Sequence, residues 1–165
     1  MEPEIDKIKL KPSVLFVCTA NICRSPMAEA IFRARLQESK EKWQEWEIGS
    51  AGTWAADGQG ASEFARKTMA ARGLDITAHQ ARSISKDLIS RYKLILTMEN
   101  SHREALVAEF PFLEKRIFLL SEMSGIKSDV RDPYGGDLEE YQYAADILDG
   151  LIRNGLSRII FLASQ

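Results

Sequence analysis

The chain has 165 residues, of which 45% are hydrophobic and 28% charged, a composition typical of a folded globular domain and not of a disordered or low-complexity chain. Its 22 basic and 24 acidic residues give a net charge of −2, which argues against binding nucleic acid through a general basic excess. We predict a single domain over residues 1–165, with its core at about residues 13–155 and an N-terminal extension at residues 1–12.

Hydropathy and cysteine content indicate a cytoplasmic protein. The longest apolar runs, residues 14–17 and 159–163, are too short to cross a bilayer core of about 30 Å, and the acidic N-terminus lacks the features of a secretory signal. Two cysteines cannot form a disulfide framework, and in a reducing compartment a close pair is more often catalytic or metal-binding. We therefore expect no membrane insertion and look for a chemical role for Cys18 and Cys23.

Short apolar segments alternate along the chain with longer segments of helical periodicity. The pattern predicts a strand at residues 14–17, followed by a loop and a helix from residue 26 to about residue 40. It then predicts a second strand at residues 47–52 and a helix from about residue 62 to residue 72, which ends at Gly73.

The second half of the chain continues this alternation. A third strand is predicted at residues 92–98, a helix at 100–110 and a fourth strand at 116–120. After a loop, apolar residues recur at helical spacing from residue 138 to about residue 153, whereas the tail at 156–165 is too short to assign by its period.

Strands that alternate with helices and are buried on both faces predict an α/β fold. We expect a three-layer, doubly wound sandwich around a four-stranded parallel sheet with right-handed crossovers. In such sheets ligands bind beyond the carboxyl ends of the strands. The loop after the first strand is therefore the first place to look for a functional site.

That loop ends at a helix N-terminus. Pro26 suits the first position of the helix, because proline has no N–H to leave unsatisfied there. Arg24 then lies at the positive end of the helix dipole, where a cation is unfavourable unless an anion is also bound. The loop can curl its amide N–H groups around an anion, and Asn21 tolerates the left-handed backbone that such a curl needs. Phosphate is the anion that fits this arrangement best.

The same positive potential favours the thiolate form of Cys18 and makes its sulfur a nucleophile. The planar guanidinium of Arg24 can bind two phosphoryl oxygens, and Ser25 can donate a hydrogen bond to the sulfur. The spacing of Cys18 and Arg24 is weak evidence by itself, but the strand before the loop and the helix after it strengthen the interpretation. For Cys23, three roles stay open: packing, donation of a backbone N–H, and a reversible protective disulfide with Cys18.

The segment at residues 18–26 with the Met-Ala-Glu-Ala that follows it resembles the active-site signature of the low-molecular-weight protein tyrosine phosphatase family. The resemblance covers about residues 14–153, and Ser-Ala-Gly-Thr at 50–53 and Leu-Thr-Met at 96–98 are closest to bacterial members. Further similar segments are Gly-Leu-Asp at 73–75, His-Gln-Ala-Arg at 79–82 and Asp-Pro-Tyr-Gly at 132–135.

This resemblance implies the flavodoxin-like fold of the phosphotyrosine phosphatases and a hydrolase that needs no metal and no cofactor. Its partner would be a phosphotyrosine-containing protein, from which it would release inorganic phosphate through a cysteinyl-phosphate intermediate. Cys18 and Arg24 would be catalytic. The resemblance implies a phosphate-binding loop made of the following residues: Thr19, Ala20, Asn21, Ile22, Cys23, Arg24 and Ser25.

The resemblance assigns the general acid to Asp132. The residues themselves agree, because the departure of a phenolate needs a proton donor and the loop after the fourth strand lies at the same edge of the sheet. The family also implies that His79 orders the loop through Asn21 and Ser50.

Aromatic side chains also enter the prediction. Trp54 and Tyr134 are candidates for the walls of the cleft, where they would hold the ring of the substrate. His102, in a predicted helix, is expected at the surface.

Other activities on the same scaffold stay open. Ile22 lies where related arginine phosphatases typically carry Thr, and its apolar branched side chain favours an aromatic substrate over a guanidinium. A thiol-coupled arsenate reductase would need a distal cysteine pair, and the chain has no cysteine beyond Cys23. A phosphocysteine carrier would have no use for both Arg24 and Asp132.

Overall fold

The computed structural model describes residues 11–165, so residues 1–10 of the predicted N-terminal extension lie outside the described residues. Its centre is a four-stranded sheet with the strand order β2-β1-β3-β4, in which all neighbouring strands are parallel. The strands are β1 (Ser13–Cys18), β2 (Glu47–Gly52), β3 (Leu94–Thr97) and β4 (Ile117–Leu119). All four overlap the predicted strands.

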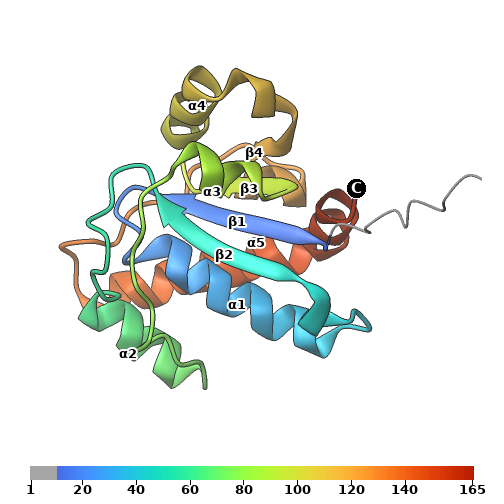
Figure 1. The fold of residues 1–165 in the computed structure, drawn as a ribbon. Coiled ribbons are helices and arrows are strands. Elements are labelled where there is room, and N and C mark those ends of the chain that lie inside the picture. The colour runs from blue at the N-terminus through green and yellow to red at the C-terminus, as the bar shows by residue number, and fades with distance from the viewer. Residues whose placement is uncertain (1–10) are drawn as a thin grey trace, which may run out of the picture.

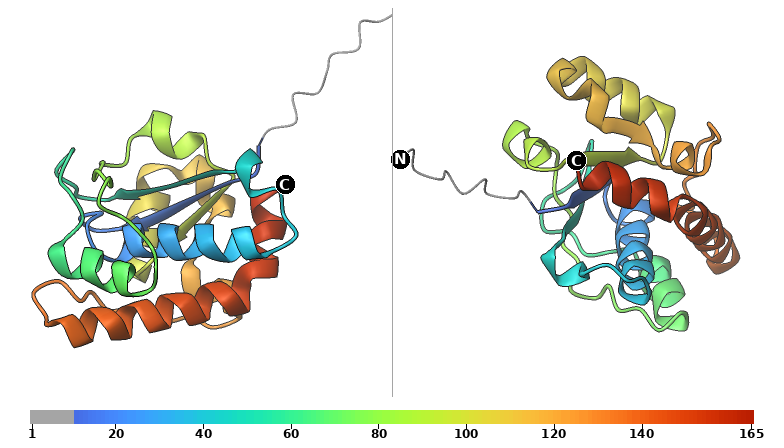
Figure 2. Two further views of the ribbon diagram at one scale, coloured as in Figure 1. Left: turned by 90° about the horizontal axis from the view of Figure 1, so that it is seen from below. Right: turned by 90° about the vertical axis from the view of Figure 1, so that its right-hand side faces the viewer.

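Helices cover both faces of the sheet and complete the predicted three-layer, doubly wound α/β fold (Figure 1). One face is covered by α1 (Arg24–Glu38) and α5 (Leu138–Ala163), with α2 (Glu63–Ala71) beside them, and the other by α3 (Lys86–Ser90) and α4 (Asn100–Glu109) (Figure 2). The 3-10 helices are η1 (Trp43–Glu45), η2 (Pro111–Arg116) and η3 (Leu120–Ser124).

Two hydrophobic clusters follow from the alternation of side chains along β1. Val14 and Phe16 belong to the larger cluster, which lies under α1 and α5, whereas Leu15 and Val17 belong to the cluster under α3 and α4. Successive side chains of a strand point to opposite faces of the sheet, so β1 can be apolar throughout. All four of these side chains have no exposed surface, and this burial holds the carboxyl end of β1 in place.

The last helix is longer than the period of the sequence indicates. The tail at residues 156–165 that could not be assigned continues α5 as far as Ala163. Just before this tail, Gly155 allows α5 to pack closely on η3, because a Cβ atom there would lie 2.6 Å from Cβ of Met123. Within residues 11–165, no helix is both long enough and apolar enough to cross a membrane.

The start of the first helix corrects one prediction. α1 begins at Arg24, with Cys23 as its N-cap, so Pro26 is the third helical residue and not the first. The correction is small, because the N–H groups of the whole first turn have no intrahelical acceptor and proline is tolerated throughout it. The predicted stop of α2 is confirmed, since Gly73 follows the helix with a φ of 76°.

Candidate active site

A pocket of about 320 Å³ opens at the carboxyl end of β1. The register of the sheet places Cys18 opposite Gly52 of β2 and Val17 opposite Thr97 of β3, so three strands end at this edge. The loop at residues 18–23 joins β1 to α1 here. The pocket is lined by Cys18, Thr19, Ala20, Ile22, Cys23, Arg24, Gln59, Asp132 and Tyr134.

The carbonyl oxygens of the loop face away from its interior. Four of them accept hydrogen bonds from groups outside the loop. In a planar trans peptide the N–H of the next residue points opposite to the carbonyl, so the N–H groups of residues 19, 20, 22 and 23 face inward. The Cys18 carbonyl accepts the N–H of Thr53 at 2.9 Å, and the Thr19 carbonyl accepts the N–H of Trp54 at 2.9 Å. The Asn21 carbonyl binds Nε2 of His79 at 2.6 Å, and the Ile22 carbonyl accepts the N–H of Ser62 at 2.9 Å.

Asn21 holds the curl of the loop together. Its φ of 57° is the only positive φ of a non-glycine residue within residues 11–165, which confirms the left-handed conformation expected there. The Asn21 amide group donates to Oγ of Ser25 at 2.8 Å and to Oγ of Ser50 at 2.9 Å. With the contact of His79 to the Asn21 carbonyl, the structure brings together the residues expected to order the loop.

Ser25 connects this network to the sulfur of Cys18. Its Oγ lies 2.9 Å from Sγ of Cys18. Because the Ser25 oxygen accepts the hydrogen bond of the Asn21 amide, its own hydrogen is available for the sulfur. A hydrogen bond donated to sulfur stabilises the thiolate over the thiol.

Arg24 is the most buried cation of the site. Its side chain is only 2% exposed, and its Nη1 donates to the carbonyl of Val130 at 2.8 Å and lies 3.3 Å from Oε2 of Glu99. Nη2 lies 3.5 Å from Oδ2 of Asp132. Within residues 11–165 the buried Nε has no hydrogen-bond partner. Nη1 is therefore fixed by the protein and Nη2 is paired with Asp132, whereas the N–H of Nε is left to donate to a bound group such as an anion.

His102 lies behind the loop and is buried, so the expectation of a surface residue is wrong. It is 4% exposed, and its Nδ1 accepts the N–H of Glu99 at 3.1 Å, which leaves the ring hydrogen on Nε2. Nε2 lies 2.8 Å from Oγ1 of Thr19 and 3.2 Å from Oε2 of Glu99. A periodic helix pattern places His102 on α4 but does not show that this turn of α4 packs against the loop.

Burial determines the charge state of His102. Removal from water lowers the pKa of its imidazole, and the nearby Arg24 guanidinium lowers it further, whereas Glu99 has the opposite effect. The neutral ring can accept at one nitrogen and donate at the other, which matches the N–H of Glu99 at Nδ1 and the Thr19 hydroxyl at Nε2. Glu99 thus joins His102 to Arg24, a connection that sequence reasoning did not find.

The family model of the low molecular weight phosphotyrosine protein phosphatases matches residues 13–159. The chain belongs to this family. A protein-arginine-phosphatase from Geobacillus stearothermophilus is 37% identical over 140 residues, which cover 84% of this chain and 90% of that protein. A probable low molecular weight protein-tyrosine-phosphatase from Ralstonia nicotianae is 34% identical over 136 residues, 82% of this chain and 88% of its own length.

Solved structures agree with this family assignment. The structure of a low molecular weight protein tyrosine phosphatase from T. tengcongensis is similar with a TM-score of 0.83 and 40% identity, over 88% of this chain and 98% of that one. The YwlE arginine phosphatase from Geobacillus stearothermophilus gives a TM-score of 0.80 and 33% identity over 89% of this chain and 92% of that one. The resemblance seen in the sequence is confirmed, and the family includes relatives named for two kinds of substrate.

The walls of the phosphatase pocket differ in part from the prediction. Tyr134 lines the pocket and is 68% exposed. Trp54 is not among the lining residues and is 85% exposed, although its N–H binds the Thr19 carbonyl. Gln59, in the loop after β2, takes a place in the wall instead. Because this loop has no periodic pattern, its sequence does not indicate that Gln59 reaches the pocket.

The second cysteine, Cys23, is the last residue of the loop at residues 18–23. Both cysteines are free thiols. Sγ of Cys23 donates to Oγ of Ser62 at 3.3 Å and lies 3.3 Å from the Tyr141 hydroxyl. Burial raises the pKa of the Cys23 thiol, and its hydrogen bonds to Ser62 and Tyr141 only partly oppose this. Cys23 is therefore held as a neutral thiol against α5.

Proposed function

We propose that this chain hydrolyses phosphotyrosine in protein substrates through a phosphate ester of Cys18. The observation that carries the proposal is the geometry around Arg24, which lines the same pocket as Cys18 and Asp132 and whose buried Nε has no hydrogen-bond partner within residues 11–165. An unpaired buried donor costs about 1–3 kcal/mol, and a phosphoryl oxygen would satisfy it. The inward-facing amides of the loop would hold the remaining oxygens.

The first step is an in-line attack of the Cys18 thiolate on phosphorus. The S–P bond forms while the bond between phosphorus and the phenolic oxygen breaks, and Asp132 transfers its proton to the leaving phenolate. Arg24 and the loop amides stabilise the charge on the equatorial oxygens. The products are the free tyrosine hydroxyl and the cysteinyl phosphate.

The second step returns the enzyme to its starting state. The ionised Asp132 accepts a proton from a water molecule, whose oxygen attacks phosphorus as the S–P bond breaks. The sulfur leaves as the thiolate that Ser25 stabilises by its hydrogen bond, and inorganic phosphate departs. One carboxyl group therefore serves first as acid and then as base, with no metal or cofactor in either step.

The walls of the pocket support an aromatic substrate. Ile22 is a buried apolar residue of the lining, and Tyr134 is an exposed aromatic residue of the same lining, where its ring can contact the substrate ring by edge or face. Phosphoarginine is the second candidate, because two similar proteins are named protein-arginine-phosphatase. We place the activity in the cytoplasm, where free thiols persist.

Initial rates on one peptide sequence that carries phosphotyrosine, phosphoarginine or phosphoserine test this choice. We expect kcat/KM to be highest for phosphotyrosine and the phosphoserine peptide to be turned over least, because its side chain is too short to carry phosphate to the floor of the pocket. An Ile22→Thr variant should shift the ratio toward phosphoarginine. Equal or faster turnover of phosphoarginine by the unaltered enzyme would make the second candidate the function.

A further inference from the structure

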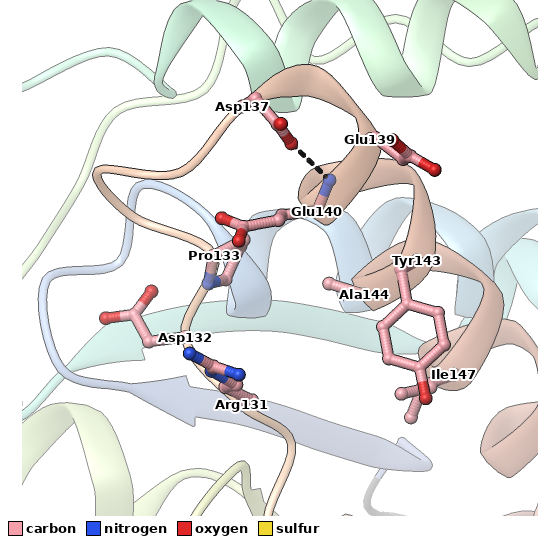
Figure 3. Close-up of a pocket in the computed structure, with 9 residues that line it drawn as sticks. All are labelled: Arg131, Asp132, Pro133, Asp137, Glu139, Glu140, Tyr143, Ala144 and Ile147. Carbon is pink, nitrogen blue, oxygen red and sulfur yellow. Dashed lines mark hydrogen bonds between the residues drawn. The ribbon is translucent and has the colours of Figure 1, made fainter.

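A second pocket, of about 390 Å³, adjoins the first one. It lies between the loop at residues 131–137 and the first turns of α5 (Figure 3). Asp132 lines both pockets. The segment that carries the proposed general acid is therefore a shared wall, and a chain bound at the first pocket has the second one directly beside it.

One side of the second pocket is apolar. Tyr143, Ala144 and Ile147 line it from α5, and their spacing of three and four residues places them on one face of the helix. Tyr143 is 66% exposed, so its ring is accessible as a surface for a flexible hydrocarbon chain. Figure 3 shows Tyr143 and Ile147 next to each other, on the part of the wall farther from Asp132.

The rest of the pocket lining is mostly acidic. Asp132, Asp137, Glu139 and Glu140 contribute carboxylates, against the single cation of Arg131. Asp137 is engaged as the N-cap of α5, because its Oδ1 accepts the N–H of Glu140 at 3.0 Å.

Glu139 and Glu140 have no such engagement. Among the salt bridges of residues 11–165, none involves either of their carboxylates. Both lie in the first turn of α5, where the helix dipole stabilises negative charge. The pocket therefore combines an apolar wall with two carboxylates that lack a cation.

We propose that this pocket binds a lysine or arginine side chain of the protein substrate, close in sequence to the phosphorylated residue. The inference rests on the proposed function and extends it to the choice of substrate. The methylene groups of the basic side chain would lie along Tyr143 and Ile147 while its charged end reaches Glu139 and Glu140, which is the usual way in which long cationic side chains cover apolar surface. The shared Asp132 wall favours a residue of the same substrate chain as the occupant.

Matched phosphotyrosine peptides test the proposal, with lysine or the uncharged norleucine placed in turn at each position flanking the phosphotyrosine. For at least one position we expect kcat/KM to be about three- to tenfold higher with lysine, and this preference to shrink at high salt. In the double variant Glu139→Gln/Glu140→Gln the preference should disappear. In Glu109→Gln, which removes an exposed carboxylate of α4 on the opposite face of the sheet, it should persist.

A small aryl phosphate separates this proposal from the proposed function. It reaches only the first pocket, so the double variant should hydrolyse it with unchanged kcat/KM. Turnover of the aryl phosphate without any lysine preference, or a lysine preference that survives in the double variant, would overturn the basic-residue site and leave the phosphatase proposal standing. Absence of turnover on both aryl phosphate and peptides would overturn the proposed function, and the site with it.

Discussion

The imidazole of His102 and the hydroxyl of Thr19, 83 positions apart in the chain, are joined by a hydrogen bond of 2.8 Å. Thr19 directly follows the proposed nucleophile, and Glu99, which also contacts His102, contacts Arg24. His102 on α4 therefore contacts Thr19 of the loop directly and is linked to Arg24 through Glu99, although it does not line the pocket itself.

Removal of this contact should weaken catalysis through the position of the loop. We expect His102→Ala to lower kcat/KM for an aryl phosphate about tenfold or more, because the rate of the reaction falls steeply when an active-site group is displaced. His102→Gln fills more of the space than alanine and can still donate to Thr19, so it should recover part of the loss. Steady-state kinetics with both variants at equal folded fraction check this, and wild-type kcat in His102→Ala would contradict it.

The neutral state of His102 also predicts a pH dependence of stability. Burial and Arg24 lower the pKa of His102 in the folded protein, whereas the unfolded chain titrates near about 6.5. Below that pH the unfolded chain binds the proton first, so the free energy of unfolding should fall as the pH drops until the folded protein also titrates. Urea unfolding at pH 7.5 and 5.5 should show a smaller loss for His102→Gln than for the unaltered protein. Equal losses in both proteins would contradict this prediction.

Gly52 should be required at the end of β2. A Cβ atom there would lie 2.4 Å from the Thr19 carbonyl oxygen and 3.1 Å from the carbonyl carbon of Ala20, and backbone cannot yield as a flexible side chain can. We expect Gly52→Ala to shift the loop, to reduce kcat/KM at least tenfold and to cost about 1–3 kcal/mol of stability.

Gly150 provides the matched control. A Cβ atom at Gly150 would meet nothing within 4 Å, and in the interior of α5 alanine is favoured over glycine by about 1 kcal/mol. Gly150→Ala should therefore keep full activity and unfold at the same or higher urea concentration. Normal kinetics in Gly52→Ala would show that the loop does not need this close approach.

The two cysteines should differ in reactivity. Burial raises the pKa of the Cys23 thiol, so Cys23 stays protonated at pH 7 and reacts slowly. We expect iodoacetamide to inactivate the enzyme by labelling Cys18, to do so at the same rate in Cys23→Ala, and to be slowed by inorganic phosphate. Peptide mass spectrometry identifies the labelled residue, and preferential labelling of Cys23 would refute the assignment.

The order of elements could be predicted because each strand and most helices carry their own period. The sequence also indicated the loop at residues 18–26, since local features such as Asn21 and Pro26 act within the loop itself. α3 was missed because Lys86–Ser90 is too short for a period to show, and the end of α5 was left unassigned because the tail at residues 156–165 is also too short to assign by its period.

The surroundings of the loop could not be predicted in the same way. Glu99, His102 and Gln59 reach the site from segments far from the loop in sequence, and their contacts depend on how α4 and the loop after β2 pack. Trp54, expected in the cleft wall, lies outside the lining because its side chain is exposed while only its backbone N–H binds the loop. The Val130 carbonyl that fixes Arg24 is a backbone group and leaves no trace in the sequence.

The formation of a phosphate ester on Cys18 is the central claim, and trapping that ester tests it most directly. Acid quenching of the Asp132→Asn variant during turnover of an aryl phosphate whose phenol is acidic enough to leave without a proton donor, followed by peptide mass spectrometry, should find the phosphoryl group on Cys18, because loss of the general base slows hydrolysis of the intermediate by about 10²–10⁴. Cys18→Ser should show no burst of the released phenol and negligible turnover. A phosphoryl group on any other residue, or full turnover by Cys18→Ser, would contradict the account.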